Sequence, residues 1–160
     1  LMAITLESAG LVRQKTRALT LHPFVFYSLK AFFAYHSSSK SNADLQIVPF
    51  DDGEVTGTDG VVIADAACVM YVAYVKKRAT ATDSYFKVFD DASADGTAGD
   101  ERITMPTLEA SESQIVVYPQ GLTMAAGIVA TSHTTPDGTT DSTAGDSGDG
   151  FIILGASGAN

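Results

Sequence analysis

The fold is decided by CVMYVAYVKKRATATDSYFKVFDD (68–91), ITMPTLEA (103–110) and QIVVYPQGLTMAAGIVATS (114–132). Short apolar runs follow one another here, separated by acidic, glycine-rich or Ser/Thr-rich turns. The apolar residues show no helical period, and each connection is too short for a helical crossover. This pattern is typical of consecutive antiparallel strands. The sequence therefore predicts an all-β fold, an antiparallel two-sheet sandwich of jelly-roll type with an N-terminal arm.

The predicted strands are spread over the chain after residue 44. The run 68–76 is apolar on nearly both sides, so we place it at the centre of the sandwich, and Lys76, Lys77 and Arg78 form a solvated strand end. The sequence YPQG (118–121) reads as a tight turn, because proline and glycine suit special backbone angles. The expected strands are 45–50, 61–66, 68–76, 84–89, 103–108, 114–118, 123–132 and 151–154.

Length and charge divide the chain into two parts. At 160 residues it fits one compact domain with an arm attached, and we assign residues 1–20 to the arm and 21–160 to the β-sandwich domain. Residues 1–40 carry a net charge of +4, whereas residues 41–160 carry −13. The acidic body should repel nucleic acid, so we expect no nucleic-acid partner.

Residues 21–36 (LHPFVFYSLKAFFAYH) contain six aromatic side chains. Aromatic density favours a strand at 23–28. The helical spacing of Phe26, Leu29 and Phe33 leaves 29–36 open between helix and strand. The cluster exceeds what a small sandwich needs for its core, so part of it is expected to form an interface.

Carboxylates gather in three polar regions, which are the candidates for metal or acid–base chemistry. The run 91–96 (DASADG) begins like a calcium loop, but Arg102 stands where the bidentate Glu is required. A looser calcium site is left open. A glycosidase pair is disfavoured because the chain has no Trp to stack on sugar. The three groups are Asp51, Asp52, Glu54 and Asp59; Asp90, Asp91, Asp95, Asp100 and Glu101; and Asp137, Asp141, Asp146 and Asp149.

Nucleophilic and metal-binding residues are scattered. His22, His36 and His133 are isolated from one another, and we expect each to be a surface or interface polar group. Cys68 sits in an apolar run and is expected to be a small buried hydrophobe. The longest apolar run, 61–75, contains Asp65 and is too short to span a bilayer, so we expect no membrane association. The sequence predicts no catalytic residues, no cofactor and no metal, and the protein is not expected to be an enzyme.

Four ordered pieces carry a resemblance: YFKVFD (85–90), MP (105–106), YPQGL (118–122) and GIV (127–129). In this order they resemble a β-sandwich pattern of virion proteins of tailed bacteriophages. The resemblance implies a structural protein that decorates or cements a phage head at the capsid surface. Such modules bridge neighbouring capsid subunits as trimers or dimers, so the implied partners are the major capsid protein and copies of the chain itself.

The expected contact residues lie in the first 40 positions, where a basic, aromatic segment suits the shell. They are Arg13, Lys15, Arg17, Phe24, Phe26, Phe32 and Phe33. The alternative function is a receptor- or carbohydrate-binding module of a phage fibre or tail. In that case the polar stretch 133–150 would be the binding element, with or without calcium.

Overall fold

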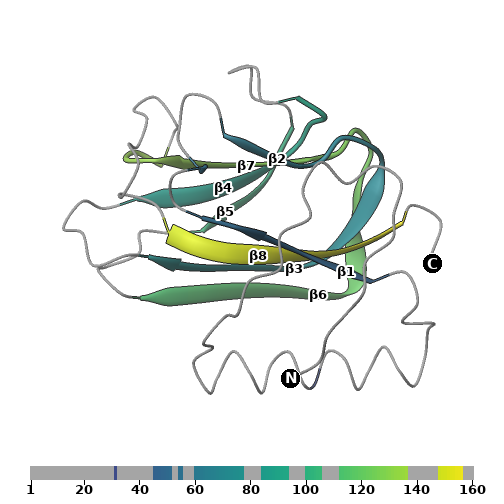
Figure 1. Cartoon of the computed structure of the whole chain (residues 1–160), viewed down its shortest axis with the longest axis horizontal. Coiled ribbons are helices and arrows are strands. Elements are labelled where there is room, and N and C mark those ends of the chain that lie inside the picture. Colours follow the sequence, from purple (N-terminus) through teal and green to yellow (C-terminus); the bar gives the residue numbers. More distant parts are fainter. Residues whose placement is uncertain are drawn as a thin grey trace.

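Eight strands make up the protein's described architecture, which is an all-β sandwich (Figure 1). The computed structural model describes residues 45–51, 54–55, 60–77, 84–93, 100–105, 112–136 and 148–156, together with Ala31. The strands are β1 (Gln46–Phe50), β2 (Val61–Ala64), β3 (Cys68–Lys77), β4 (Tyr85–Asp90), β5 (Asp100–Met105), β6 (Ser113–Met124), β7 (Ile128–His133) and β8 (Gly148–Ala156). No helix among the described residues has the length and apolar character needed to cross a membrane.

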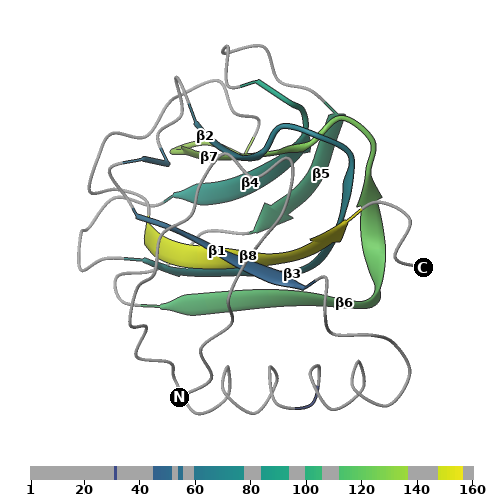
Figure 2. The same ribbon diagram turned by 45° about the vertical axis from the view of Figure 1, so that its right-hand side comes forward.

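The strands form two four-stranded sheets, stacked on each other as Figure 2 shows. The first sheet has the order β1-β8-β3-β6 and the second sheet has the order β2-β7-β4-β5. All neighbouring strands are antiparallel. The chain changes sheet at every connection except that from β4 to β5. Eight strands arranged in this way make the double Greek key of a jelly roll, which confirms the predicted fold.

The interior between the sheets is apolar because alternate residues of each strand point into it. Phe50 of β1 stacks on Phe86 of β4 across this interior, with ring centroids 5.3 Å apart and an interplanar angle of 13°. The central strand β3 contributes Met70 and Val75, both fully buried. As predicted, β3 pairs on both edges, with β8 on one side and β6 on the other.

A bulge interrupts the pairing of β3 with β6, and it corrects the prediction of a turn at residues 118–121. Met70 pairs with Leu122 and Val72 pairs with Val117, so residues 118–121 lie opposite Tyr71 within one continuous strand. Pro119 is tolerated because β6 is the edge strand of its sheet, where a missing N–H breaks no ladder. Gly121 has φ +82°, and a Cβ there would clash with Cγ1 of Val69.

Other strand boundaries also differ from the sequence prediction. The expected strand 123–132 is wrong, because residues 125–127 separate β6 from β7. The strand expected at 103–108 begins instead at Asp100, and that expected at 151 begins at Gly148. Lys77 was expected in a solvated strand end but is 1% exposed, because it lies on the same side of β3 as Val75, which faces the interior. The expected arm 1–20 and the strand 23–28 lie outside the described residues.

Candidate functional site

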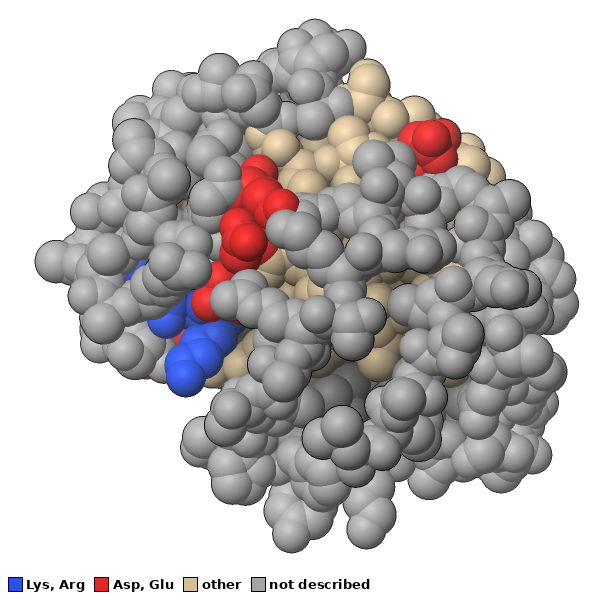
Figure 3. Space-filling view, viewed as in Figure 1, with Lys and Arg blue, Asp and Glu red and all other residues tan. Residues whose placement is uncertain are grey.

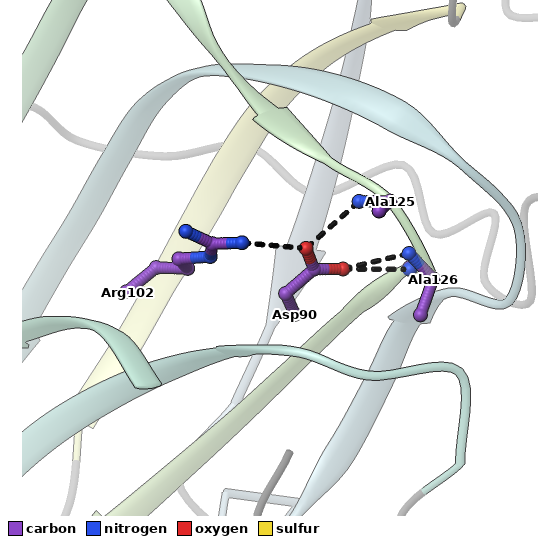
Figure 4. Close-up of polar contacts among 5 residues, drawn as sticks. Asp90, Arg102, Ala125 and Ala126 are labelled. Atoms are coloured by element: carbon purple, nitrogen blue, oxygen red, sulfur yellow. Dashed lines mark hydrogen bonds and ion pairs between the residues drawn. The ribbon is translucent and has the colours of Figure 1, made fainter. Parts of the chain in front are cut away.

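The Asp90 carboxylate at the end of β4 is enclosed by hydrogen bonds (Figure 4). Its side chain is 4% exposed. The backbone N–H of Ala125 donates to Oδ2 at 2.8 Å, and the N–H groups of Ala126 and Gly127 donate to Oδ1 at 2.7 and 3.4 Å. The Arg102 guanidinium of β5 donates to Oδ2 at 3.2 Å. Asp90 therefore ties β4 and β5 to the connection between β6 and β7.

These contacts decide what the carboxylate can do chemically. Burial raises the pKa of Asp90, but the three backbone N–H donors and the Arg102 guanidinium outweigh burial and hold the pKa below its ordinary value. A carboxylate offers about four lone-pair positions, and the four donors occupy them. Asp90 thus holds the loop in place as an ionised acceptor, and it is poorly suited to take a proton from a substrate.

The structure gives Asp90, Asp91 and Glu101 different surroundings, although the sequence grouped them together. Asp100 lies opposite Asp90 in the β4–β5 pairing, and Asp95 lies outside the described residues. Asp90 is buried, whereas the Asp91 carboxylate accepts the Ser93 N–H at 3.1 Å in an exposed turn. Glu101 lies on β5 and pairs with Lys87. Among the residues that the structure describes, no three His, Cys, Asp or Glu side chains gather as metal ligands would.

Cys68 lies in the interior cluster near Asp90, and its side chain forms no disulfide. Burial, followed by the negative charge of Asp90, raises the pKa of the thiol to about 12. A thiol with this pKa stays protonated at neutral pH and is a poor nucleophile. The prediction that Cys68 is a buried hydrophobe is confirmed.

A second polar cluster lies on the side of the second sheet that faces away from the first. Lys87 of β4 is 3% exposed, and its Nζ lies 2.7 Å from Oε2 of Glu101, which is 43% exposed. The Thr104 hydroxyl donates to the other oxygen of Glu101. Burial raises the pKa of Glu101, but the Lys87 and Thr104 hydrogen bonds and the charges of Lys87 and His133 lower it overall. Lys87 and Glu101 therefore form a charge-assisted hydrogen bond that joins β4 to β5.

His133 is part of the same cluster, which corrects the expectation of a surface or interface histidine. It ends β7, is buried, and its Nε2 lies 3.0 Å from Oγ1 of Thr131, two residues earlier on the same strand face. Because both side chains are buried, the pair packs against the sheet and does not open towards a substrate. No spacing in the sequence pointed to this cluster, since Lys87 and Glu101 come to it from other strands.

The predicted contact residues lie outside the described residues, so their role stays a prediction. They are Arg13, Lys15, Arg17, Phe24, Phe26, Phe32 and Phe33. The same holds for residues 137–147 of the polar stretch. The topology defines the chain as a jelly-roll sandwich, and the described polar clusters hold its strands together. No protein family, curated protein or solved structure matches the chain.

Proposed function

We propose that this protein is a structural component of a tailed-phage virion, a jelly-roll module that decorates or cements the head by bridging neighbouring capsid subunits. The fold supports the proposal by analogy, because eight-stranded jelly rolls are used in viral capsid domains. The sequence resemblance to phage virion proteins points the same way.

The observation that carries the proposal is the division of charge along the chain. Residues 1–40 are basic and aromatic, whereas the sandwich is acidic. On the face in Figure 3, acidic side chains form a row on the described surface, with a smaller basic group beside it. A module of this kind would contact the shell through its basic segment and present its acidic body to solvent. The major capsid protein and further copies of the chain are the proposed partners.

The polar chemistry of the described sandwich is compatible with this role. The carboxylate of Asp90 accepts four hydrogen bonds, and the Lys87 ammonium is engaged by Glu101. Both clusters connect neighbouring strands or loops, as expected of side chains selected for a rigid scaffold.

Co-sedimentation with shells assembled from the major capsid protein of the same virus tests the proposal. The triple substitution Arg13→Gln, Lys15→Gln and Arg17→Gln should weaken binding and reduce its dependence on salt. The control removes positive charges outside the basic segment: Lys76→Gln with Arg78→Gln. Failure of the unsubstituted protein to bind shells would refute the proposal. Equal loss in the N-terminal variant and in this control would refute the role of the N-terminal basic residues.

A receptor- or carbohydrate-binding role is the second candidate, and one described feature favours it. A shallow open hollow at the β6 bulge is lined by Tyr118, Pro119, Gln120 and Gly121. An aromatic ring beside an amide is a combination that sugar-binding surfaces use. A glycan-array signal that is lost with Tyr118→Ser and retained with Tyr85→Ser would support this function in place of shell binding.

A further inference from the structure

One face of the first sheet is apolar and buried although it points away from the second sheet. We call it the outer face, and define it by Val69, Tyr71, Val72, Tyr74, Phe151 and Ile153. None of these side chains belongs to the interior cluster between the sheets. Tyr71 and Tyr74 are each only 2% exposed. An antiparallel sheet face that met water would carry polar side chains. Other atoms of the protein must therefore shield the outer face from water, and we call them its cover.

The register of the first sheet makes the outer face continuous. Tyr74 of β3 lies opposite Phe151 of β8, with ring centroids 5.0 Å apart and an interplanar angle of 31°. Val72 lies opposite Ile153 in the same strand pair. The bulge at Tyr71 places the side chains of both Tyr71 and Val72 on this side of the sheet. The result is an unbroken apolar surface over the two central strands.

The cover belongs to the same chain and lies outside the two sheets. These burials are those of a single chain, so no second copy provides the cover. All eight strands belong to the two sheets, and the second sheet packs on the face of the first sheet that is opposite to the outer face (Figures 1 and 2). The covering side chains must therefore lie in a segment that the described strands do not include.

Composition identifies this segment. After residue 44, the segments outside the described residues contain Leu108 as their only large aliphatic or aromatic side chain. The remaining residues there are small, polar or charged, apart from Pro106. Residues 21–36, by contrast, contain six aromatic residues. Residues 1–20 also contain large aliphatic side chains, but aromatic side chains bury more area, about 150–250 Å² each. The aromatic segment is also the nearer of the two to β1, so it is the better candidate for the cover.

The connection to β1 allows this placement. Residues 37–44 join the aromatic segment to Leu45, which is itself buried in the cluster of the outer face. Eight residues can span up to about 26–29 Å, and four paired strands are only about 14–15 Å wide. The segment can therefore return over the sheet without strain in the link.

Ala31, the described residue within the aromatic segment, indicates which side chains would face the sheet. It has helical backbone conformation and is exposed. On a helix of 3.6 residues per turn, Phe26, Leu29 and Phe33 lie within about 40° of the direction opposite to Ala31. Tyr27 and Tyr35 lie within about 40° of Ala31 itself.

We propose that residues 21–36 cover the outer face of their own chain, with Phe26, Leu29 and Phe33 packed against it. The inference does not depend on the proposed virion function. It assigns Phe26 and Phe33 to the fold of the monomer and leaves Arg13, Lys15 and Arg17 as the residues for contact with the shell.

Hydroxyl-radical footprinting with peptide mass spectrometry tests this placement on the full chain. Phe26→Ser with Phe33→Ser should raise the oxidation of Tyr71 and Tyr74 several-fold. The matched control, Tyr27→Ser with Tyr35→Ser, also removes two aromatic rings and should leave it unchanged. Equal oxidation of Tyr71 and Tyr74 in both variants would overturn the proposal.

Cys68 shows whether the sandwich itself is still folded, because it faces the interior between the sheets. Maleimide should label it in neither variant. If maleimide labels Cys68 in the Phe26/Phe33 variant, the sandwich of that variant has opened. In that case NMR on the unsubstituted protein tests the placement of residues 21–36. Nuclear Overhauser effects should then connect the methyl groups of Val72 and Ile153 to ring protons of residues 21–36, and their absence would refute the proposal.

The same footprint distinguishes the chain's own segment from that of another copy. Protection of Tyr71 and Tyr74 by the same chain does not depend on protein concentration. Protection that is lost on dilution would place the segment of a second copy on the outer face, and would overturn the assignment.

Discussion

Replacing Asp90 with Asn tests whether one buried carboxylate holds the β6–β7 connection. Asp90→Asn keeps the size of the side chain and one oxygen acceptor, but it removes the charge. It also turns an NH₂ group towards backbone N–H groups that are themselves donors. The Gly127 N–H is buried, so it has little access to replacement water. We expect the variant to fold and to be clearly less stable.

The size of the loss follows from the four contacts. The Ala125 and Ala126 N–H groups donate at 2.8 and 2.7 Å, whereas the Gly127 N–H and Arg102 contacts are longer. Hydrogen bonds to a charged group contribute about 1.5–3 kcal/mol each, and a neutral acceptor keeps part of this, so we expect a loss of about 3 kcal/mol. For a chain of this size, that loss lowers the melting temperature by roughly 6–12 °C.

Urea unfolding followed by circular dichroism, from neutral to acidic pH, measures this difference. The folded pKa of Asp90 is lowered, so its contribution is fully present above the ordinary carboxyl pKa and is lost as the pH falls through the folded value. The gap between the unsubstituted protein and Asp90→Asn should therefore stay constant at neutral pH and shrink in acid. Glu101 titrates in both proteins, so its effect cancels.

Asp91→Asn is the matched control, because it removes the same charge from the next residue, whose carboxylate accepts one backbone N–H in an exposed turn. A surface change of this kind alters stability by about 0.5 kcal/mol or less. If Asp90→Asn were no more destabilising than this control, or if its deficit grew on acidification, the account of Asp90 given above would be wrong.

Three further outcomes are expected. Gly121→Ala should lower the free energy of unfolding by about 2–3 kcal/mol, because φ is positive and the added Cβ would lie 2.9 Å from Tyr71 Cε1; an unchanged melting curve would contradict this. Glu101→Gln should cost about 1–2 kcal/mol by leaving Lys87 without its counter-charge, and adding Lys87→Met should recover part of the loss; no recovery in the double variant would argue against the pair. Cys68 should resist thiol reagents at pH 8 in native protein and react in urea, since its pKa is about 12; rapid native labelling would refute its burial.

Local pattern was enough to predict the fold class. Short apolar runs with turn signals between them predicted antiparallel strands, and the run that became β3 predicted a central strand because it is apolar on both sides. That two-sided character was also the one sequence signal of the outer face. A strand with one solvated face would alternate, whereas Tyr71, Val72 and Tyr74 join alternate interior residues in an unbroken apolar run.

Turn chemistry was misread where it depended on position in the sheet. Residues 118–121 have the composition of a turn, yet they form a bulge inside β6 because that strand lies at an edge and can accommodate proline. The true break at residues 125–127 has no strong turn signal in the sequence. Its backbone N–H groups are satisfied by Asp90, which is 35 residues or more away along the chain.

The sequence by itself determined the strand-forming segments, the division of charge and the burial of Cys68, because these depend on the composition and periodicity of neighbouring residues. The tertiary structure decided the strand order, the different surroundings of Asp90, Asp91 and Glu101, and the partners of Asp90, Lys87 and His133. Those features depend on contacts between strands distant in sequence. A carboxylate followed by a turn is the same sequence pattern whether it faces water or three backbone N–H groups, and only the packing of β4 against the β6–β7 connection distinguishes the two.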